Sequence, residues 1–259
     1  AVILKKYNRA VDYNAKTTTW EISLNEDQFD MDSVVLTDTF PNGGLELVAG
    51  TLKVLHADGS AVAPSWYTAK EDEPKKGFTV TFHQSFNETL KVTYTTTFNN
   101  DWKIDKTKSE FRNRAHLAWL EGTQNKTITK DAVLSPDNLT KTNGDKSGAY
   151  NPRTKEISWT IRANYNKKEM AQAVFTDKLL QNQKFVPGSL LVYEMKLTGA
   201  ANGTTRGDLV DPILYDAVLP DEANGNELRV AFKNAINSPY QMVFKTTLDG
   251  EVIASEVSN

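Results

Sequence analysis

The chain of 259 residues contains no cysteine and only three histidines. The lack of cysteine excludes disulfide bonds, zinc–thiolate sites and thiol nucleophiles. The histidines, His56, His83 and His116, stand far apart and fit no metal-ligand spacing, so no metal site is expected. Nucleophile-elbow, P-loop and dinucleotide-binding motifs are missing as well, so we expect no cofactor and no turnover enzyme.

Long apolar runs and an excess of basic residues are also missing. The opening run Ala1–Leu4 is too short for a membrane span or for the core of a signal peptide. The 30 Lys and Arg residues are scattered among 33 Asp and Glu residues, which gives a net charge of −3. This pattern predicts neither a nucleic-acid partner nor membrane contact. If the protein is exported, its signal and anchor are expected outside this sequence.

What the sequence does contain is an internal repeat. The segment Trp20-Glu-Ile-Ser-Leu-Asn25 returns as Trp159-Thr-Ile-Arg-Ala-Asn164. In both copies a Thr-Asp pair follows, and its aspartate, Asp38 or Asp177, lies thirteen residues after the asparagine. A repeat of roughly 110 to 130 residues is too long for a solenoid unit and predicts two homologous domains in tandem.

Apolar and polar residues alternate with a period of two in both copies. Trp20, Ile22 and Leu24 share one face of a strand, and the polar residues between them face the other way. Similar runs, rich in β-branched and aromatic residues, are separated by Gly, Pro and Asn turns. Helical periodicity is weak, and its best candidate is 167–172. The pattern predicts an all-β fold of two tandem immunoglobulin-like antiparallel β-sandwich domains.

The boundary between the domains is predicted at Ser135-Pro-Asp-Asn138, which interrupts the strand pattern. The predicted domains are therefore 1–135 and 136–259. Copy one opens with Leu4-Lys-Lys6, and the strand pattern of copy two is expected to resume at Leu139-Thr-Lys141. This alignment makes Lys141 the expected equivalent of Lys6.

The alternation of apolar and polar residues predicts which way three polar side chains of copy one point. Lys6, Asp38 and Asn113 fall on the apolar side of their strands, whereas Arg112 and Arg114 fall on the other side. Copy two is expected to supply a matching inward-facing set: Lys141, Asp177 and Asn259.

These three residue types can react with one another. Burial disfavours the charged forms of lysine and aspartate. A neutral lysine is a nucleophile, and a protonated aspartate can polarise an amide and shuttle a proton. Attack of the lysine amine on the asparagine amide, with loss of ammonia, would give an isopeptide bond. Taken singly, each residue also fits a turn aspartate or a solvated lysine; two sets in matched register favour the reaction.

The repeated Trp-x-Ile-x-x-Asn and Thr-Asp segments and the run Pro187–Tyr193 resemble the collagen-adhesin A-type domains. These are immunoglobulin-like modules of Gram-positive, cell-wall-anchored surface adhesins, and the resemblance covers nearly the whole chain. It implies self-catalysed Lys–Asn bonds promoted by aspartate. Carried onto this sequence, the bonds are Lys6–Asn113 with Asp38, and Lys141–Asn259 with Asp177. The neighbouring Lys5 leaves the choice of the first lysine open.

The resemblance leads to two hypotheses about function. The first is a stalk of a surface adhesin, stabilised mechanically and thermally by the cross-links. The second is a binding head that grips collagen or another host extracellular-matrix polymer between its two domains. A short linker, and no strand or latch after Asn259, favour the stalk. We expect a monomer at the cell surface whose only chemistry is a single self-cross-linking turnover.

Overall fold

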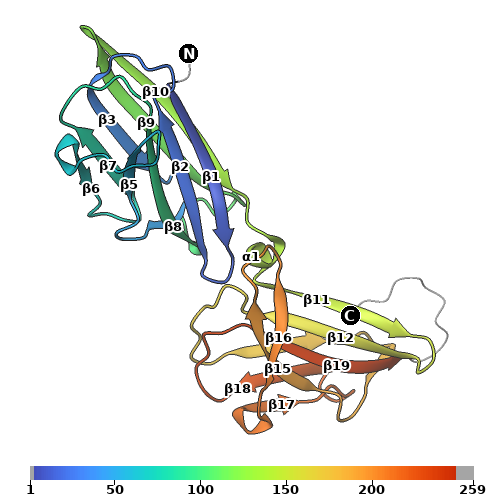
Figure 1. Cartoon of the computed structure of the whole chain (residues 1–259). Helices are drawn as coiled ribbons and strands as arrows, with labels where there is room; N and C mark the ends of the chain where they lie inside the picture. Colours follow the sequence, from blue (N-terminus) through green and yellow to red (C-terminus); the bar gives the residue numbers. More distant parts are fainter. Residues whose placement is uncertain (1–2, 249–259) are drawn as a thin grey trace. The chain divides into compact units, whose positions relative to one another are not determined.

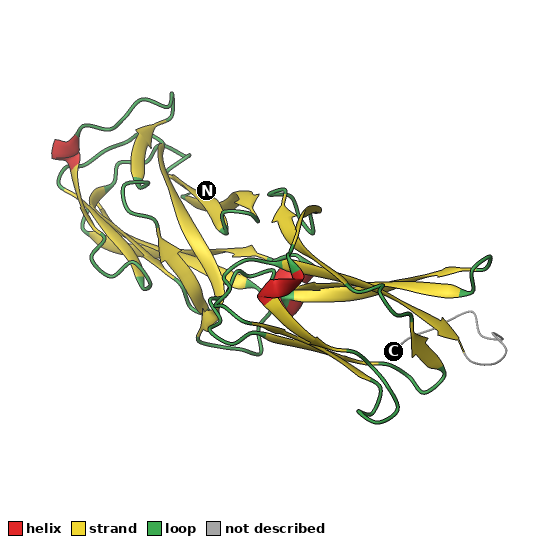
Figure 2. Cartoon of the chain, turned by 90° about the horizontal axis from the view of Figure 1, so that it is seen from below, coloured by secondary structure: helices red, strands yellow, loops and turns green. Residues whose placement is uncertain are grey.

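The part of the chain that the structure describes, residues 3–248 of a computed structural model, is built almost entirely of β-strands. The chain divides into two compact units, residues 1–137 with 199–201, and residues 138–198 with 202–259. Strands and loops make up nearly all of the ribbon (Figure 2). The predicted all-β class is therefore confirmed.

The first unit is a sandwich of two antiparallel sheets (Figure 1). One sheet has the strand order β1-β2-β8-β4, with β5 also paired to β8, and the other has the order β10-β9-β3-β7-β6. A short 3-10 helix, η1, precedes β6. The elements are β1 (Leu4–Asp12), β2 (Thr17–Leu24), β3 (Asp32–Thr39), β4 (Gly43–Leu47), β5 (Lys53–His56), η1 (Pro64–Trp66), β6 (Tyr67–Lys70), β7 (Gly77–Phe82), β8 (Leu90–Lys103), β9 (Phe111–Glu121) and β10 (Gln124–Leu134).

The core of this unit lies between the inner faces of the two sheets. Trp20 and Ile22 on β2 are buried in the same cluster as Leu36 on β3 and Leu117 on β9. The indole of Trp20 donates a hydrogen bond of 2.9 Å to Thr96 Oγ1 on the neighbouring β8, so its one polar atom is satisfied. Alternation along each strand, read from the sequence, therefore gives the correct inner face.

The second unit repeats most of this arrangement. Its larger sheet has the order β11-β12-β19-β15-β16, with β14 also paired to β19, and its smaller sheet has the order β13-β18-β17. A one-turn helix, α1, precedes β11. The elements are α1 (Asn138–Thr142), β11 (Gly144–Asn151), β12 (Glu156–Ala163), β13 (Val174–Lys178), β14 (Gln183–Phe185), β15 (Leu191–Leu197), β16 (Thr204–Leu209), η2 (Pro212–Leu214), β17 (Tyr215–Val218), β18 (Glu227–Phe232) and β19 (Tyr240–Leu248).

The repeated Trp-x-Ile-x-x-Asn segment forms the same structure in both units. Asn25 and Asn164 follow the ends of β2 and β12 with φ angles of 60° and 56°, a left-handed conformation that asparagine tolerates. The side chain of Asn25 accepts from the amide of Phe29 and donates to its carbonyl, at 2.9 and 2.8 Å. Asn164 makes the same pair of bonds to Lys168, both at 3.0 Å. These asparagines shape loops and are not among the residues expected to form cross-links.

Two local predictions are wrong. Residues 167–172 form an irregular loop with an isolated bridge at Met170 rather than a helix. The helix lies instead at α1, where the sequence predicted a linker followed by a new strand. On this helix Leu139 and Thr140 are both buried, a pattern that a strand alternating every second residue cannot produce.

Candidate functional site

Three strands of the first unit bring together the residues that the sequence singled out. Lys6 comes from β1, Asp38 from β3 and Asn113 from β9, so both sheets contribute. The ammonium of Lys6 contacts Asp38 Oδ1, and both side chains are fully buried, with 0% of their surface exposed. Asn113 is equally buried, at 0% exposure. The three predicted residues of copy one therefore share one buried site.

A fourth residue, Tyr94 on β8, lies at the centre of this site. Its hydroxyl donates to Asp38 Oδ2 at 2.6 Å. The same hydroxyl accepts from Lys6 Nζ and from Asn113 Nδ2, each at 2.8 Å. One donated and two accepted bonds use the full capacity of a phenolic hydroxyl. Alternation along β8 does not identify Tyr94 as a site residue, because its partners lie on three other strands.

Burial shifts the ionisation of all three titratable groups. Loss of water lowers the pKa of Lys6, although the Asp38 carboxylate acts to raise it. Loss of water also raises the pKa of Asp38, against the opposing effects of Lys6, Tyr94 and Asn113. For the same reason the pKa of Tyr94 lies well above its ordinary value of 10.0. Both shifts act in the direction of the neutral amine and the protonated carboxyl, the two forms that the reaction needs.

The amide of Asn113 has an unsatisfied acceptor. Its carbonyl oxygen Oδ1 is buried and has no hydrogen-bond partner among the described residues. Such an oxygen costs about 1–3 kcal/mol. The side chain of Asn113 acts on the pKa of Asp38 through a hydrogen bond, so the two groups are neighbours, and a protonated Asp38 would be a donor. Donation from Asp38 would polarise the carbonyl at the carbon that an amine attacks.

The orientation of β1 decides which of the two neighbouring lysines, Lys5 or Lys6, lies in the site. Lys5 points outward from β1, where its ammonium pairs with Glu26 at 2.8 Å and its side chain is 41% exposed. Lys6 faces the interior beside Asp38. Because successive residues of a strand face opposite sides, only one lysine of the pair can enter the site.

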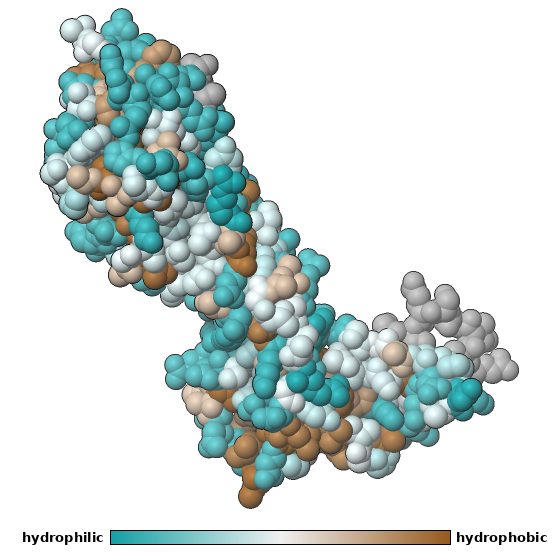
Figure 3. Space-filling view, in the orientation of Figure 1, coloured by the Kyte–Doolittle hydropathy of each residue, from teal (hydrophilic) through white to brown (hydrophobic). Residues whose placement is uncertain are grey.

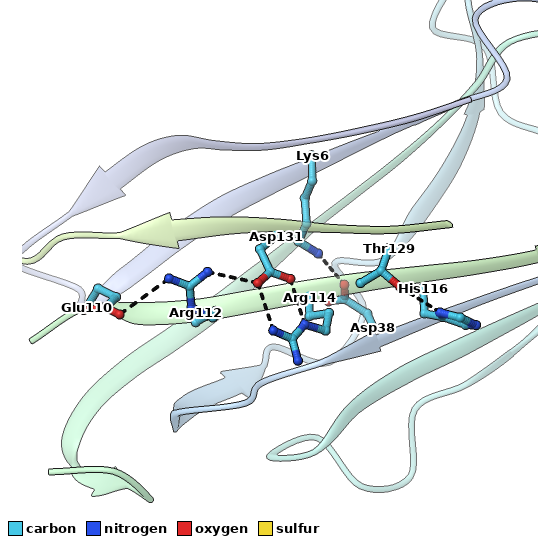
Figure 4. A network of polar contacts seen from close by, with 8 residues as sticks. All are labelled: Lys6, Asp38, Glu110, Arg112, Arg114, His116, Thr129 and Asp131. Carbon is cyan, nitrogen blue, oxygen red and sulfur yellow. Dashed lines mark hydrogen bonds and ion pairs between the residues drawn. The ribbon is translucent and has the colours of Figure 1, made fainter. Parts of the chain in front are cut away.

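Figure 4 shows the polar residues on the outer face of β9 and β10, next to the site. Arg112 and Arg114 of β9 hold Asp131 of β10, with N–O distances of 2.9 and 2.8 Å. These arginines flank Asn113 in sequence and face away from it, as the alternation predicted. The ion pairs fasten β10 to the strand that carries Asn113, and they lower the pKa of Asp131.

In the second unit a different lysine occupies the site. Lys146 on β11 binds both carboxylate oxygens of Asp177 on β13, at 2.8 and 2.9 Å. Lys141, the predicted partner of Asp177, lies exposed on α1 instead, and this prediction is corrected. Lys146 stands opposite Ile161, as Lys6 stands opposite Ile22, so the two lysines occupy equivalent positions.

A signal for Lys146 was present in the sequence. Lys6 lies fourteen residues before Trp20 (20 − 6), and Lys146 lies thirteen residues before Trp159 (159 − 146). The difference of one residue matches a register shift between Asn8 and Ala10 in the β1–β2 pair, a shift that the β11–β12 pair lacks. Lys141, eighteen residues before Trp159, is much too far away.

Within the described residues, the surroundings of Asp177 differ from those of Asp38. Phe244 stands opposite Trp159, as Tyr94 stands opposite Trp20, so a phenylalanine replaces the tyrosine. Within residues 3–248, β13 pairs only with β18, whereas β3 pairs with both β7 and β9. Asn259, the predicted reactive asparagine, lies outside the described residues.

Other kinds of site find little support in the described part of the chain. No group of three or more His, Asp or Glu residues there could hold a metal ion. None of the helices there combines the length and the apolar character that a membrane span needs. Large apolar side chains are exposed on the second unit, where Figure 3 shows brown residues gathered over its lower part. Those on η2 and β17 are Ile213, Leu214 and Val218.

Several solved structures resemble this chain at low sequence identity. The collagen-binding subdomain of the Enterococcus faecalis surface protein ACE is 12% identical, with a TM-score of 0.39 over 51% of this chain and 96% of that one. The collagen-binding domain of a Staphylococcus aureus adhesin is 15% identical, with a TM-score of 0.37 over 51% of this chain and 97% of that one. The full-length major pilin SpaD of Corynebacterium diphtheriae is 11% identical, with a TM-score of 0.45 over 93% of this chain and 50% of that one.

A comparison with curated proteins gives no match. The sequence does match the collagen binding domain family, and it does so twice, over residues 2–127 and again over residues 141–259. These two matches cover most of both repeats. The chain therefore belongs to the collagen binding domain family and carries two of its domains in tandem.

Proposed function

We propose that this chain is a structural stalk segment of a bacterial surface adhesin, and that its first domain locks itself with a Lys6–Asn113 isopeptide bond. The observation that supports this most directly is the burial of Lys6, Asp38 and Asn113 around one hydroxyl group. An ion pair kept only for stability is seldom buried so completely, because the desolvation penalty offsets its attraction. A site for a reaction that needs neutral groups explains the burial.

The proposed reaction is a transamidation. The neutral amine of Lys6 attacks Cγ of Asn113 while the protonated carboxyl of Asp38 donates to the amide oxygen. The C–N bond to Nδ2 then breaks. Nδ2 takes up the proton that the lysine nitrogen gives away and leaves as ammonia, so protons balance without an external acid or base. The product is one amide bond between β1 and β9.

Such a bond would suit a stalk under tension. Lys6 lies on the first strand, and 107 positions separate it from Asn113 (113 − 6). Pulling force would pass from β1 to β9 through the cross-link, and the strands between them would carry no load. Closing a loop of about 100 residues stabilises a domain by roughly 4–5 kcal/mol when the entropy model for disulfides is applied. An isopeptide bond cannot be reduced, which suits a cysteine-free protein at the cell surface.

For the second domain we propose that Lys146, with Asp177, takes the role that the sequence analysis gave to Lys141. Their side chains are partly accessible, at 24% and 14% exposure. Asn259, expected from the sequence to bond to Lys141, becomes the proposed partner of Lys146. Each domain would then hold one cross-link of the same type.

The test is the intact mass of the purified chain, followed by peptide mapping. We expect a mass lower than the sequence mass by one ammonia for each bond, with Lys6 joined to Asn113. A Lys6→Arg variant is the matched control, because it keeps the positive charge and has no lysine nucleophile. An unshifted mass in correctly folded protein would reject the proposal.

A second candidate function is collagen binding by this segment itself. It is favoured by the family match and by the exposed apolar side chains of η2 and β17, among them Ile213, which is 68% exposed. Exposed apolar patches often mark binding surfaces. Saturable binding to immobilised collagen that falls at least tenfold with Ile213→Asp, but not with Ile104→Asp on the first unit, would favour this candidate over the stalk.

A further inference from the structure

The hydroxyl of Tyr94 lies between the two nitrogen atoms that the proposed reaction exchanges. Lys6 Nζ, the attacking nitrogen, and Asn113 Nδ2, the leaving nitrogen, each donate to it at 2.8 Å. Its own proton is directed at Asp38 Oδ2, 2.6 Å away. No other hydroxyl group among the described residues is recorded in contact with these two nitrogens.

Tyr94 is held firmly in this position. Its ring packs edge to face against Phe78, with centroids 4.8 Å apart, and the residue is 2% exposed. Its backbone lies opposite Trp20 in the middle of the sheet. The ring therefore cannot move away from the site without disturbing the core, although rotation about the C–O bond can redirect the hydroxyl proton.

The second unit shows the arrangement without this hydroxyl. Phe244 occupies the position equivalent to Tyr94, opposite Trp159. There Lys146 binds both oxygens of Asp177, at 2.8 and 2.9 Å. In the first unit the two carboxylate oxygens of Asp38 have different partners instead: Oδ1 contacts Lys6, and Oδ2 accepts a hydrogen bond from Tyr94. Packing at this position does not require a tyrosine, so the hydroxyl of Tyr94 calls for an explanation of its own.

We propose that Tyr94 is a catalytic residue of the first domain, which relays a proton from the attacking nitrogen of Lys6 to the leaving nitrogen of Asn113. This inference rests on the proposed function and adds a residue to it. Asp38 keeps its own role, the polarisation of the amide oxygen.

The relay balances without any other reactant. When Lys6 Nζ bonds to Cγ, the carbon becomes tetrahedral, Nζ gains a positive charge, and Nδ2 regains a basic lone pair. The tyrosine oxygen accepts the surplus proton from Nζ while its own proton turns from Asp38 to Nδ2. The Cγ–Nδ2 bond breaks, ammonia leaves, and Tyr94 ends as a neutral phenol. Its raised pKa is consistent with a hydroxyl that remains protonated before and after the step.

The experiment follows cross-link formation in time. The full chain, recovered unfolded and un-cross-linked, is diluted into native buffer, and its intact mass is recorded at intervals. Positioned acid–base groups contribute about 10²- to 10⁴-fold to a rate, so we expect Tyr94→Phe to slow the loss of the first-domain ammonia by about 100-fold or more. Tyr13→Phe, at another buried tyrosine of the same unit, is the matched control and should leave the rate unchanged.

A second measurement keeps the test decisive if Tyr94→Phe folds poorly. Replacing all tyrosines by fluorotyrosine makes the phenols more acidic with little change in shape, and it should change the rate and pH profile of cross-linking if a phenol moves the proton. An unchanged rate with fluorotyrosine, or with folded Tyr94→Phe, would overturn the relay while leaving the cross-link intact. Absence of ammonia loss in the unsubstituted chain would instead reject the proposed function itself.

Discussion

Tyr94 and Phe244 occupy the same position in their two sheets, each opposite a tryptophan whose indole donates to a threonine at 2.9 Å. The two residues differ by one hydroxyl group. In the first unit that hydroxyl joins Lys6, Asp38 and Asn113 into one network. In the second unit the lysine binds its aspartate directly through both oxygens. The repeated domains thus share a framework but have different sites.

The first prediction concerns Asp38. Asp38→Asn keeps the shape of the side chain but cannot supply a proton, so the chain should retain the ammonia of the first domain. Loss of a cross-link worth roughly 4–5 kcal/mol should lower the melting temperature of that domain by about 10–25 °C. Mass spectrometry and calorimetry measure the two effects. Asp131→Asn is the control: it removes the outer ion pairs and a charge that acts to raise the pKa of Lys6, so it should keep the cross-link. Full cross-linking in Asp38→Asn would assign the catalysis to another group.

The second prediction concerns pH. Burial raises the pKa of Asp38 from its ordinary 3.8 and lowers that of Lys6 from its ordinary 10.5. Between the two shifted values the pair holds one proton, whether as an ion pair or as amine and acid. The fraction of the reactive neutral pair is therefore independent of pH in that interval.

Cross-linking should accordingly proceed at a constant rate over a plateau that lies within pH 3.8 to 10.5. Below the plateau a second proton charges Lys6 and removes the nucleophile. Above it the shared proton is lost, and no acid remains to polarise the amide. Refolding into buffers of graded pH, with the mass read at fixed times, measures the profile. A rate that rises steadily with pH through the whole interval would contradict a shared proton.

The third prediction separates the two lysines of the second unit. Lys146→Met removes a partner of the largely buried Asp177, which should cost about 1–3 kcal/mol in the free energy of unfolding of that unit. It also removes the nucleophile of the proposed cross-link, which should cost roughly 4–5 kcal/mol more. Lys141→Met changes an exposed residue of α1 and should have an effect within about 0.5 kcal/mol. Denaturant titration of both variants compares them. A larger effect for Lys141→Met would restore the alignment drawn from sequence.

The fourth prediction concerns the loop asparagines. Asn25→Ala removes the bonds to Phe29 and places alanine at a φ of 60°, which should destabilise the first unit by about 2–3 kcal/mol. Asn25→Gly loses the same bonds without the backbone strain and should cost about 1 kcal/mol less. Asn164→Ala should affect the second unit in the same way. If the glycine and alanine variants are equally stable, backbone strain contributes nothing at this position.

The sequence determined which residues face the interior wherever a strand is regular. Lys6, Asp38 and Asn113 were placed correctly because side chains alternate along a strand, and this rule needs only the order of residues. The spacing of Trp20 and Asn25, repeated at Trp159 and Asn164, likewise reflects local structure. The tandem organisation follows from the same repeat and is supported by the two family matches.

Only the tertiary structure decided which residues meet. Lys146 rather than Lys141 reaches Asp177 because one turn of helix occupies the place of the expected strand, and because a register shift in β1 changes the spacing between lysine and tryptophan. Tyr94 enters the site because four strands from two sheets converge there. Alternation gives each side chain a face of its own strand, but contacts between strands far apart in sequence depend on register and sheet packing, which period-two patterns do not specify.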